Sequence, residues 1–171
     1  MISQLDAAEA RAAIPDLAAV LVDCVAGGAS VNFMQGYSQA DGEAFFARVA
    51  DDVARGDAVL FVGRVDGRIL GTVQLGLDTP PNQRHRADIK KMLVHRDARK
   101  RGLGAALLTA AEQAAPRHRR TVLVLDTVLG GDGERLYARQ GWIRVGEIPD
   151  YALFPDGSYC ATVYFWKRVG D

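Results

Sequence analysis

The stretch MLVHRDARKRGLGAA, residues 92–106, decides the fold, because it joins an apolar segment to a helical one. Residues 87–94 read as a strand, and residues 102–115 read as a helix with one apolar face. The start of a helix leaves backbone N–H groups unpaired and carries a partial positive charge. Three basic side chains and two glycines lie there: Arg99, Lys100, Arg101, Gly102 and Gly104. Because the glycines leave the donors accessible, this stretch predicts a cradle for a phosphate group.

The cradle matches neither of two common phosphate-binding motifs. The dinucleotide fingerprint needs three glycines in G-x-G-x-x-G spacing, and the P-loop needs Gly-Lys-Ser/Thr. Residues 92–106 contain neither pattern. The same residues are also compatible with a solvated basic turn capped by glycines, or with a patch that binds nucleic acid. The motif alone leaves these alternatives open.

The rest of the chain alternates between short apolar runs and helical periodicity. Strands are expected at residues 58–62, 69–75, 87–94, 122–125, 142–148 and 159–166. Helices are expected over the first 27 residues with an interruption near Pro15, at 41–56 with Asp41 as its cap, at 102–115 and at 132–140. The strand–helix–strand unit of residues 87–125 implies a parallel pair, and the turns at 65–68 and 155–157 imply antiparallel hairpins. The expected fold is α/β, with a mixed, mostly antiparallel central sheet and helices on both faces.

Length and composition are those of an ordinary globular chain. The 171 residues are 49% hydrophobic and 25% charged, which excludes a disordered chain. This length supports one core, so a single domain over residues 1–171 is expected. Two cysteines, Cys24 and Cys160, are too few for a disulfide framework and are expected to be free and buried.

Several classes of site are not indicated by the sequence. Histidines and cysteines do not cluster with metal-ligand spacing, so no metal is expected. The start of the chain lacks a signal-peptide pattern, and no apolar run approaches the roughly 18–20 residues of a membrane span. We therefore expect no membrane partner and a cytoplasmic location.

Charge is distributed unevenly although the formal net charge is zero. Residues 84–120 carry a net charge of +8, residues 1–83 carry −6, and residues 121–171 carry −2. A basic middle segment indicates a polyanionic ligand for that segment rather than for the whole surface. Because the whole chain is neutral, we expect no nucleic-acid partner.

Two motifs resemble the GNAT superfamily of acetyl-CoA-dependent N-acetyltransferases. Residues 92–94 followed by Arg99-x-x-Gly102-x-Gly104 are similar to the signature of that family. The segment LYARQGW, residues 136–142, is similar to its Tyr-x-x-x-Gly-Phe segment, with Trp in place of Phe. The resemblance covers most of the chain and is weakest before residue 55. It implies the acyl-CoA N-acyltransferase fold, in which two parallel strands of the sheet splay apart.

The resemblance also implies acetyl-CoA as the cosubstrate. The pantetheine arm would pair with the strand that precedes the cradle, at Met92, Leu93 and Val94. The pyrophosphate would lie on the backbone N–H groups of Arg101, Gly102, Leu103, Gly104 and Ala105. Arg99 and Lys100 would then face phosphate oxygens.

Catalytic residues follow from the same resemblance, which implies direct transfer of acetyl to an amine. Tyr137, four residues before Gly141, is the candidate acid for the leaving thiolate, and the Val94 N–H is the candidate oxyanion donor. Asp88 is the candidate base, at a position where many relatives carry Glu, and Asp126 is a second carboxylate. Because an ammonium has a pKa of about 10, a carboxylate needs a water relay or a raised pKa to deprotonate it. Each aspartate is equally compatible with substrate binding or capping.

A narrower resemblance concerns the acceptor. Residues 87–94, 125–127, 144–149 and 155–157 are similar to the tabtoxin-resistance branch of the superfamily, which implies a small, amino-acid-like acceptor. One departure is Gly130, because relatives often carry Asn there, seven residues before the tyrosine, in contact with the cofactor arm.

The predicted partner is a small-molecule primary amine, bound by a monomer or homodimer. A protein or peptide N-acetyltransferase and a non-catalytic acetyl-CoA sensor are the alternatives. Candidate acceptor-binding residues lie in loops and near strand ends, at Asn32, Phe33, Tyr37, Tyr151 and Tyr159. Each of these is equally compatible with ordinary packing.

Overall fold

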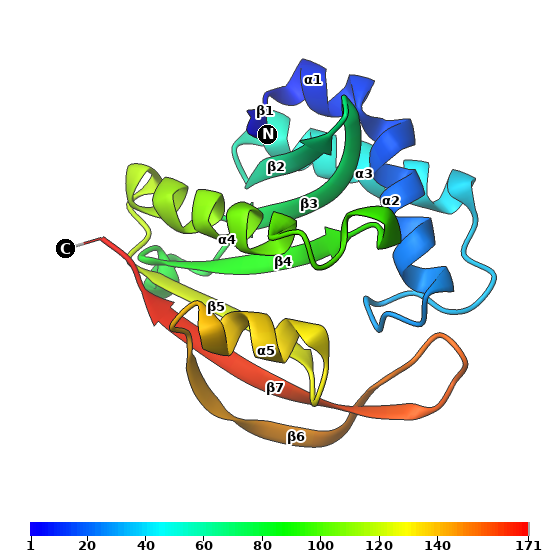
Figure 1. Cartoon of the computed structure of the whole chain (residues 1–171). Helices are drawn as coiled ribbons and strands as arrows, with labels where there is room; N and C mark the ends of the chain where they lie inside the picture. Colours follow the sequence, from blue (N-terminus) through cyan, green and yellow to red (C-terminus); the bar gives the residue numbers. More distant parts are fainter. Residues whose placement is uncertain (171) are drawn as a thin grey trace.

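The computed structural model describes residues 1–170, in which helices cover a twisted sheet (Figure 1). The helices are α1 (Ala7–Ala12), α2 (Ile14–Ala26), α3 (Gln39–Arg55), α4 (Leu103–Ala114) and α5 (Asp132–Arg139). The strands are β1 (Ile2–Leu5), β2 (Ala58–Val65), β3 (Arg68–Gly76), β4 (Arg86–Val94), β5 (Val122–Val128), β6 (Ile143–Leu153) and β7 (Tyr159–Arg168). Three short 3₁₀ turns lie among the described residues, at Pro81–Gln83, Arg96–Ala98 and Ala115–His118.

The seven strands form one sheet in the order β1-β2-β3-β4-β5-β7-β6. All neighbours are antiparallel except β4 and β5, which pair in parallel only from Arg86 with Val122 to Asp88 with Val124. Beyond Asp88 the two strands continue without pairing to each other within residues 1–170. The predicted mixed sheet with a splayed parallel pair is therefore confirmed.

A bulge in β4 lies just beyond the point where the strands separate. Thr72 of β3 pairs with Leu93, and Gln74 pairs with Lys90, so two residues of β4 face one residue of β3. Lys91 adopts a positive φ of 49°, which is uncommon for a side chain other than Gly, Asn or Asp. The bulge bends β4 and changes the direction in which its side chains point.

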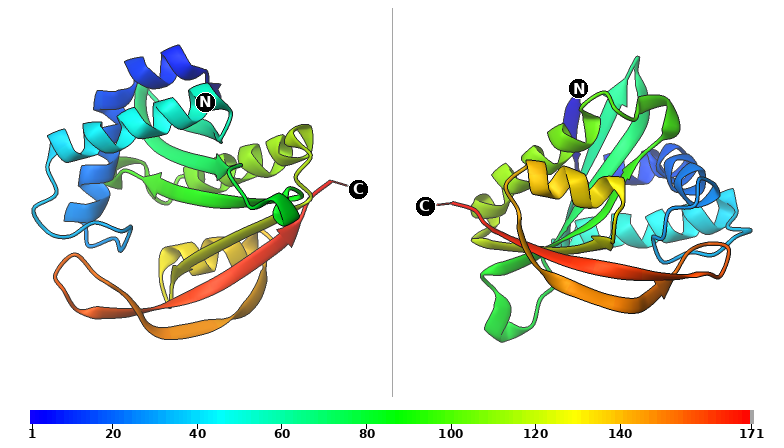
Figure 2. Two further views of the ribbon diagram at one scale, coloured as in Figure 1. Left: turned by 180° about the vertical axis from the view of Figure 1, so that it is seen from behind. Right: turned by 60° about the horizontal axis from the view of Figure 1, so that its bottom comes forward.

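The two faces of the sheet carry different helices and different cores (Figure 2). On one face, which we call the α4–α5 face, Leu107 and Leu108 pack against Val73 and Leu75. On the other face, the α1–α3 face, buried side chains of α2 and α3 pack against β2. Alternation along a strand then assigns each polar side chain to one face.

Most predicted elements are confirmed, with three corrections. The N-terminus is not helical throughout, because Ile2–Leu5 pairs with β2 as an edge strand. Helix α3 begins earlier than predicted, since Ser38 is its N-cap and Asp41 is the partner that completes the capping box. Strand β6 continues to Leu153, well past the predicted end at residue 148. The predicted restart at Pro15 is confirmed, because the proline lies in the first turn of α2.

Candidate active site

The predicted cradle is a turn that leads directly into α4. Lys100 and Gly102 both have positive φ, at 60° and 79°, and Gly102 is the N-cap of α4. Glycine adopts this conformation without steric cost. Its lack of a side chain also means that no side-chain cap satisfies the first N–H groups of α4. These donors, at Leu103, Gly104 and Ala105, are left for a ligand, together with the positive end of the helix dipole.

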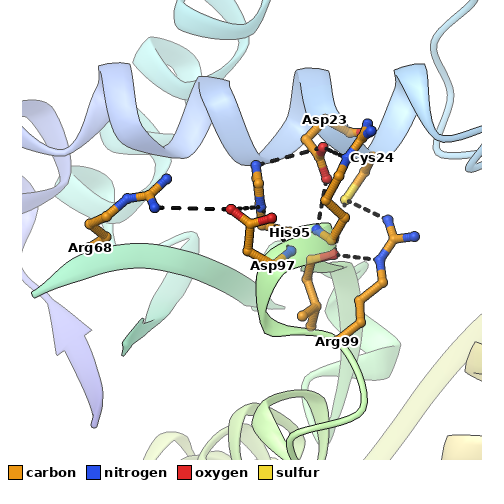
Figure 3. Close-up of polar contacts among 8 residues, drawn as sticks. Asp23, Cys24, Arg68, His95, Asp97 and Arg99 are labelled. Carbon is orange, nitrogen blue, oxygen red and sulfur yellow. Dashed lines mark hydrogen bonds and ion pairs between the residues drawn. The ribbon is translucent and has the colours of Figure 1, made fainter. Parts of the chain in front are cut away.

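The basic side chains of this turn have different partners (Figure 3). Arg99 donates from Nε to the Val94 carbonyl oxygen at 3.0 Å and lies 4.0 Å from the Cys24 sulfur. Arg96 forms an ion pair with Asp23 of α2. Lys100 and Arg101 are exposed. Arg99 and Lys100 were both predicted to face phosphate oxygens. Arg99 instead bonds Val94 and lies against α2, whereas the Lys100 side chain is exposed at the turn.

Gly104 faces the gap between β4 and α5. A Cβ at this position would lie 3.3 Å from Leu136 Cδ2 and 3.7 Å from Val94 Cγ2. A larger side chain would therefore enter the space beside the unpaired edge of β4. The open N–H groups, the positive helix end and the missing side chain together fit a phosphate-bearing ligand whose arm enters this gap.

The three strand residues predicted to line that arm lie on both sides of the sheet. Met92 and Val94 are half-buried and pack against the α4–α5 core, whereas Leu93 is buried in the α1–α3 core. The Val94 carbonyl oxygen accepts the bond from Arg99 and a second from the Cys24 thiol at 3.6 Å. Arm contacts on this carbonyl would thus compete with both donors.

Tyr137 lies on the α4–α5 face, with its ring 5.9 Å from that of Trp142 and 6.0 Å from that of Phe165 between centroids. The residue is only 5% exposed. Burial raises the pKa of its hydroxyl, and the negative charge of Asp126 raises that pKa further. Tyr137 therefore stays protonated across the physiological range, as a proton donor must.

The two predicted carboxylates lie on the opposite face. Ala87 and Ile89 belong to the α4–α5 core, so alternation directs Asp88 to the α1–α3 face, where Arg86 forms an ion pair with it. Leu125 belongs to the same core, so Asp126 also points to the α1–α3 face. Asp126 accepts a hydrogen bond of 2.8 Å from the Thr162 hydroxyl. Asp88 ends the paired segment of β4 and β5, so both carboxylates stand where the strands separate.

Tyr164 is a side chain that the sequence analysis missed. It pairs with Asp126 across β5 and β7, and its hydroxyl lies 2.8 Å from that of Tyr151. The hydrogen bond to Tyr151, followed by burial and the charges of Asp126 and Asp88, raises the pKa of Tyr164 to about 12. Only the strand register could have indicated this residue, because β7 follows β5 by more than thirty positions.

Two loops meet at the open end of the gap on the α1–α3 side. Ser30, in the loop between α2 and α3, donates to the Leu153 carbonyl at 2.7 Å. The Gln35 N–H donates to the Pro155 carbonyl at 2.9 Å. We call these two bonds the loop clasp. A cavity of about 460 Å³ lies between the loops, beside Tyr37 and Phe154. Both views in Figure 2 place the loop after α2 beside the β6–β7 turn.

The predicted acceptor-binding residues are not all equivalent. Phe33 and Tyr37 stack with ring centroids 4.2 Å apart, and the Tyr37 hydroxyl donates to the Asp41 carbonyl at 3.0 Å. Tyr151 contacts Tyr164, as described above. Tyr159 is 71% exposed near the β6–β7 turn, and Asn32 has a positive φ of 79° in the clasp loop. Tyr151 therefore lies close to the carboxylates, through its contact with Tyr164. The Tyr37 hydroxyl instead bonds the first turn of α3.

Further predicted features have simple structural outcomes. Gly130 has a positive φ of 74°, and its N–H donates to Glu134 at 2.6 Å, so this position serves a turn. Cys24 and Cys160 are free and buried, as predicted. Within residues 1–170 no group of three or more His, Cys, Asp or Glu side chains could hold a metal ion. No helix in the same range has the length and apolarity needed to cross a membrane.

Solved structures similar to this chain include proteins described as acetyltransferases. Ribosomal-protein-alanine N-acetyltransferase from Brucella melitensis is 20% identical, with a TM-score of 0.81 over 99% of both chains. The putative acetyltransferase yncA from Salmonella typhimurium, solved with acetyl-CoA, is 16% identical, with a TM-score of 0.82 over 100% of this chain and 94% of that one. A putative phosphinothricin N-acetyltransferase is 15% identical, with a TM-score of 0.76 over 100% of this chain and 99% of that one.

A sheet that splits between two parallel strands, with open helix N–H groups beside the split, defines the acyl-CoA N-acyltransferase fold. Residues 29–142 match the acetyltransferase (GNAT) family, and the chain belongs to that family. The activity that follows is acetyl transfer with acetyl-CoA as the cosubstrate. The residues of the cradle fit this cosubstrate, since they offer backbone donors and positive charge at one end of the gap.

Proposed function

We propose that this protein transfers the acetyl group of acetyl-CoA to the primary amine of a small molecule by direct attack. The observation that carries the proposal is the placement of Asp88 and Asp126 across the gap from the cradle. An ammonium group is attracted to this pair, and the gap connects the pair with the α4–α5 face. Amine and thioester can therefore approach from opposite faces of the sheet.

Each step of the transfer has a candidate group in this chain. Acetyl-CoA supplies a carbonyl activated as a thioester. Asp88 or Asp126 accepts the ammonium proton, directly or through a water molecule. The Val94 N–H donates to the carbonyl oxygen as that oxygen gains negative charge. Tyr137 gives its proton to the departing sulfur. Its raised pKa keeps the hydroxyl protonated until that step.

The loop clasp favours a small acceptor over a protein. A polypeptide acceptor needs more open space around the reacting amine than a small molecule does. Here Ser30 and Gln35 connect the loop after α2 to the β6–β7 turn. The sequence resemblance to the tabtoxin-resistance branch also supports an amino-acid-like acceptor. We further propose a cytoplasmic location, which the two free thiols support.

A screen for release of free CoA tests this function. The purified full-length chain is incubated with acetyl-CoA and with amino acids, polyamines, amine antibiotics or short peptides. We expect release of CoA with a subset of the small amines. For these amines kcat/KM should exceed that for peptides by at least about tenfold, which corresponds to about 1.4 kcal/mol. A preference for peptides would reassign the protein to peptide acetylation. Tight acetyl-CoA binding without release on the whole panel would indicate a sensor.

A further inference from the structure

Lys91 occupies an unusual place on the α1–α3 face. It lies in the bulge of β4, between the position of Asp88 and the end of the strand, and has a φ of 49°. Its ammonium nitrogen stands 5.5 Å from the ring centroid of Phe33 and 5.7 Å from that of Phe45. The side chain thus extends from the split in the sheet toward the loop after α2 and toward α3.

No carboxylate within residues 1–170 lies within 4.0 Å of the Lys91 nitrogen. At longer range the negative charge of Asp126 acts on this ammonium, and so does the positive charge of the neighbouring Lys90. Another cation, Arg48, stands 6.0 Å from the Phe45 ring centroid. Burial is the largest influence on this ammonium and lowers its pKa, which Asp126 only partly offsets.

A half-buried cation without an ion-pair partner is costly, although two aromatic rings offset part of that cost. A Met or Leu at this position would fill the space between the rings without desolvating a charge. The position is also within a bulge, a feature that often redirects a side chain beside an active site. Both observations indicate that the charge of Lys91 serves a ligand.

We propose that Lys91 binds a carboxylate of the acceptor, so that the acceptor is an amino acid or a close analogue carrying both an amine and a carboxylate. This inference rests on the proposed amine acetylation. The ammonium end of such a molecule meets Asp88 and Asp126, and the carboxylate end meets Lys91 beside the Phe33 ring. The polarity of the acceptor therefore matches the order of charges on the α1–α3 face.

The test compares amino acids with their carboxamides, which keep the amine and lose the negative charge. The probes are the series from glycine to 6-aminohexanoate and their carboxamides, because the distance between amine and carboxylate is the unknown. With the unmodified protein we expect at least one acid to exceed its carboxamide by about tenfold in kcat/KM, mainly through KM. With Lys91→Gln this preference should disappear while turnover of the carboxamide is unchanged.

Lys90→Gln is the matched control, since it removes the same charge one residue earlier. The Lys90 side chain is exposed and lies over Gly76. The Lys90→Gln variant should keep the preference for the acid over its carboxamide. Equal rates for acids and carboxamides in the unmodified protein would overturn the inference. So would an equal loss on acids and carboxamides in Lys91→Gln, which would instead indicate a base or a structural role.

A binding measurement separates this inference from the proposed function. The N-acetylated forms of the same acids and carboxamides are titrated calorimetrically into the full chain in the presence of CoA. We expect about tenfold tighter binding of one N-acetyl acid than of its carboxamide, lost in Lys91→Gln. This result without any acetyl transfer would refute only the proposed function. Transfer to amines without this difference in binding would refute only the role of Lys91.

Discussion

The two faces of the sheet differ in what they use to make a site. On the α4–α5 face the cradle consists of backbone N–H groups that glycines leave accessible. On the α1–α3 face the proposed acceptor site consists of side chains from separate elements: Phe33, Phe45, Asp88, Lys91, Asp126 and Tyr164. Backbone donors recognise any ligand with the same phosphates, whereas side chains select one acceptor. Within a single sheet, one face can therefore be general and the other specific.

The largest expected effect tests the backbone face. Gly104→Glu would place a carboxylate in the gap beside Val94 and Leu136, where it would repel phosphate and block the arm. We expect the affinity for acetyl-CoA to fall by about 100-fold or more, equivalent to about 2.7 kcal/mol. Calorimetric titration measures this loss, and circular dichroism checks the fold.

Gly104→Ala is the graded control, because its Cβ alone meets Leu136 at 3.3 Å. A side chain this small should weaken acetyl-CoA binding only a few-fold. If Gly104→Glu bound acetyl-CoA normally, the turn before α4 would not hold the phosphates of acetyl-CoA, and the contrast between the two faces would be wrong.

The next effect concerns the proton donor on the same face. Tyr137→Phe removes the hydroxyl but keeps the ring between Trp142 and Phe165. We expect kcat to fall by about 100-fold, typical of a lost general acid, with acetyl-CoA affinity nearly unchanged. Because the pKa of Tyr137 is raised, the unmodified enzyme should keep its turnover at pH values where an ordinary tyrosine begins to ionise. Rapid-quench kinetics and a pH–rate profile measure both.

Equal turnover in Tyr137→Phe would leave Tyr137 as a core side chain. A fall in acetyl-CoA affinity as large as the fall in kcat would show that the hydroxyl binds the cosubstrate instead. Either result would show that Tyr137 is not the proton donor for the departing sulfur.

A smaller effect is expected from the carboxylates of the α1–α3 face. Asp88 ends the paired segment of the two parallel strands and must be ionised to accept a proton. Asp88→Asn should lower kcat by about tenfold, because an amide cannot accept the ammonium proton. Asp126→Asn should instead raise KM for the amine. The Thr162 hydroxyl already donates to one oxygen of Asp126, so we expect this carboxylate to bind the amine rather than take its proton.

The two variants separate the roles of base and binding group on the α1–α3 face. If only Asp126→Asn lowers kcat, the roles are exchanged. If neither variant lowers kcat, both carboxylates bind substrate and another group takes the proton.

The predictability of the two faces from sequence follows from the same difference. The cradle lies within residues 99–105, and Tyr137 lies in a second local motif, so spacing alone could indicate both. The strand–helix–strand unit and the Asp66–Gly67 turn likewise predicted the parallel pair and one hairpin, since both depend on local geometry. Contact between Asp126 and Tyr164 depends instead on a register between strands, which local patterns do not encode.

The elements that the sequence analysis missed have related causes. Strand β1 has only four residues and is held by pairing with β2 rather than by its own pattern, so helical periodicity nearby obscured it. The cap of α3 was assigned to Asp41 because an aspartate and a serine three residues apart are both good caps. The bulge at Lys91 has no glycine to mark it, so the direction of that side chain could be seen only in the folded chain.

The smallest expected effect concerns the loop clasp, which connects the loop after α2 to the β6–β7 turn. Ser30→Ala removes the hydroxyl that donates to Leu153. Because this bond is exposed to solvent, the free energy of unfolding should fall by about 1 kcal/mol or less. Freer loops should admit larger acceptors, so the ratio of kcat/KM for small amines over peptides should fall a few-fold. Chemical denaturation and the CoA-release assay measure the two quantities.

Ser158→Ala is the matched control, because its hydroxyl bonds Asp156 within the β6–β7 turn and does not connect the two loops. It should cost similar stability and leave the selectivity unchanged. If both serine variants lowered the selectivity equally, the effect would come from a loosened turn and not from the clasp. If neither did, the size of the acceptor would be set deeper in the gap, by the side chains around Lys91 and Asp126.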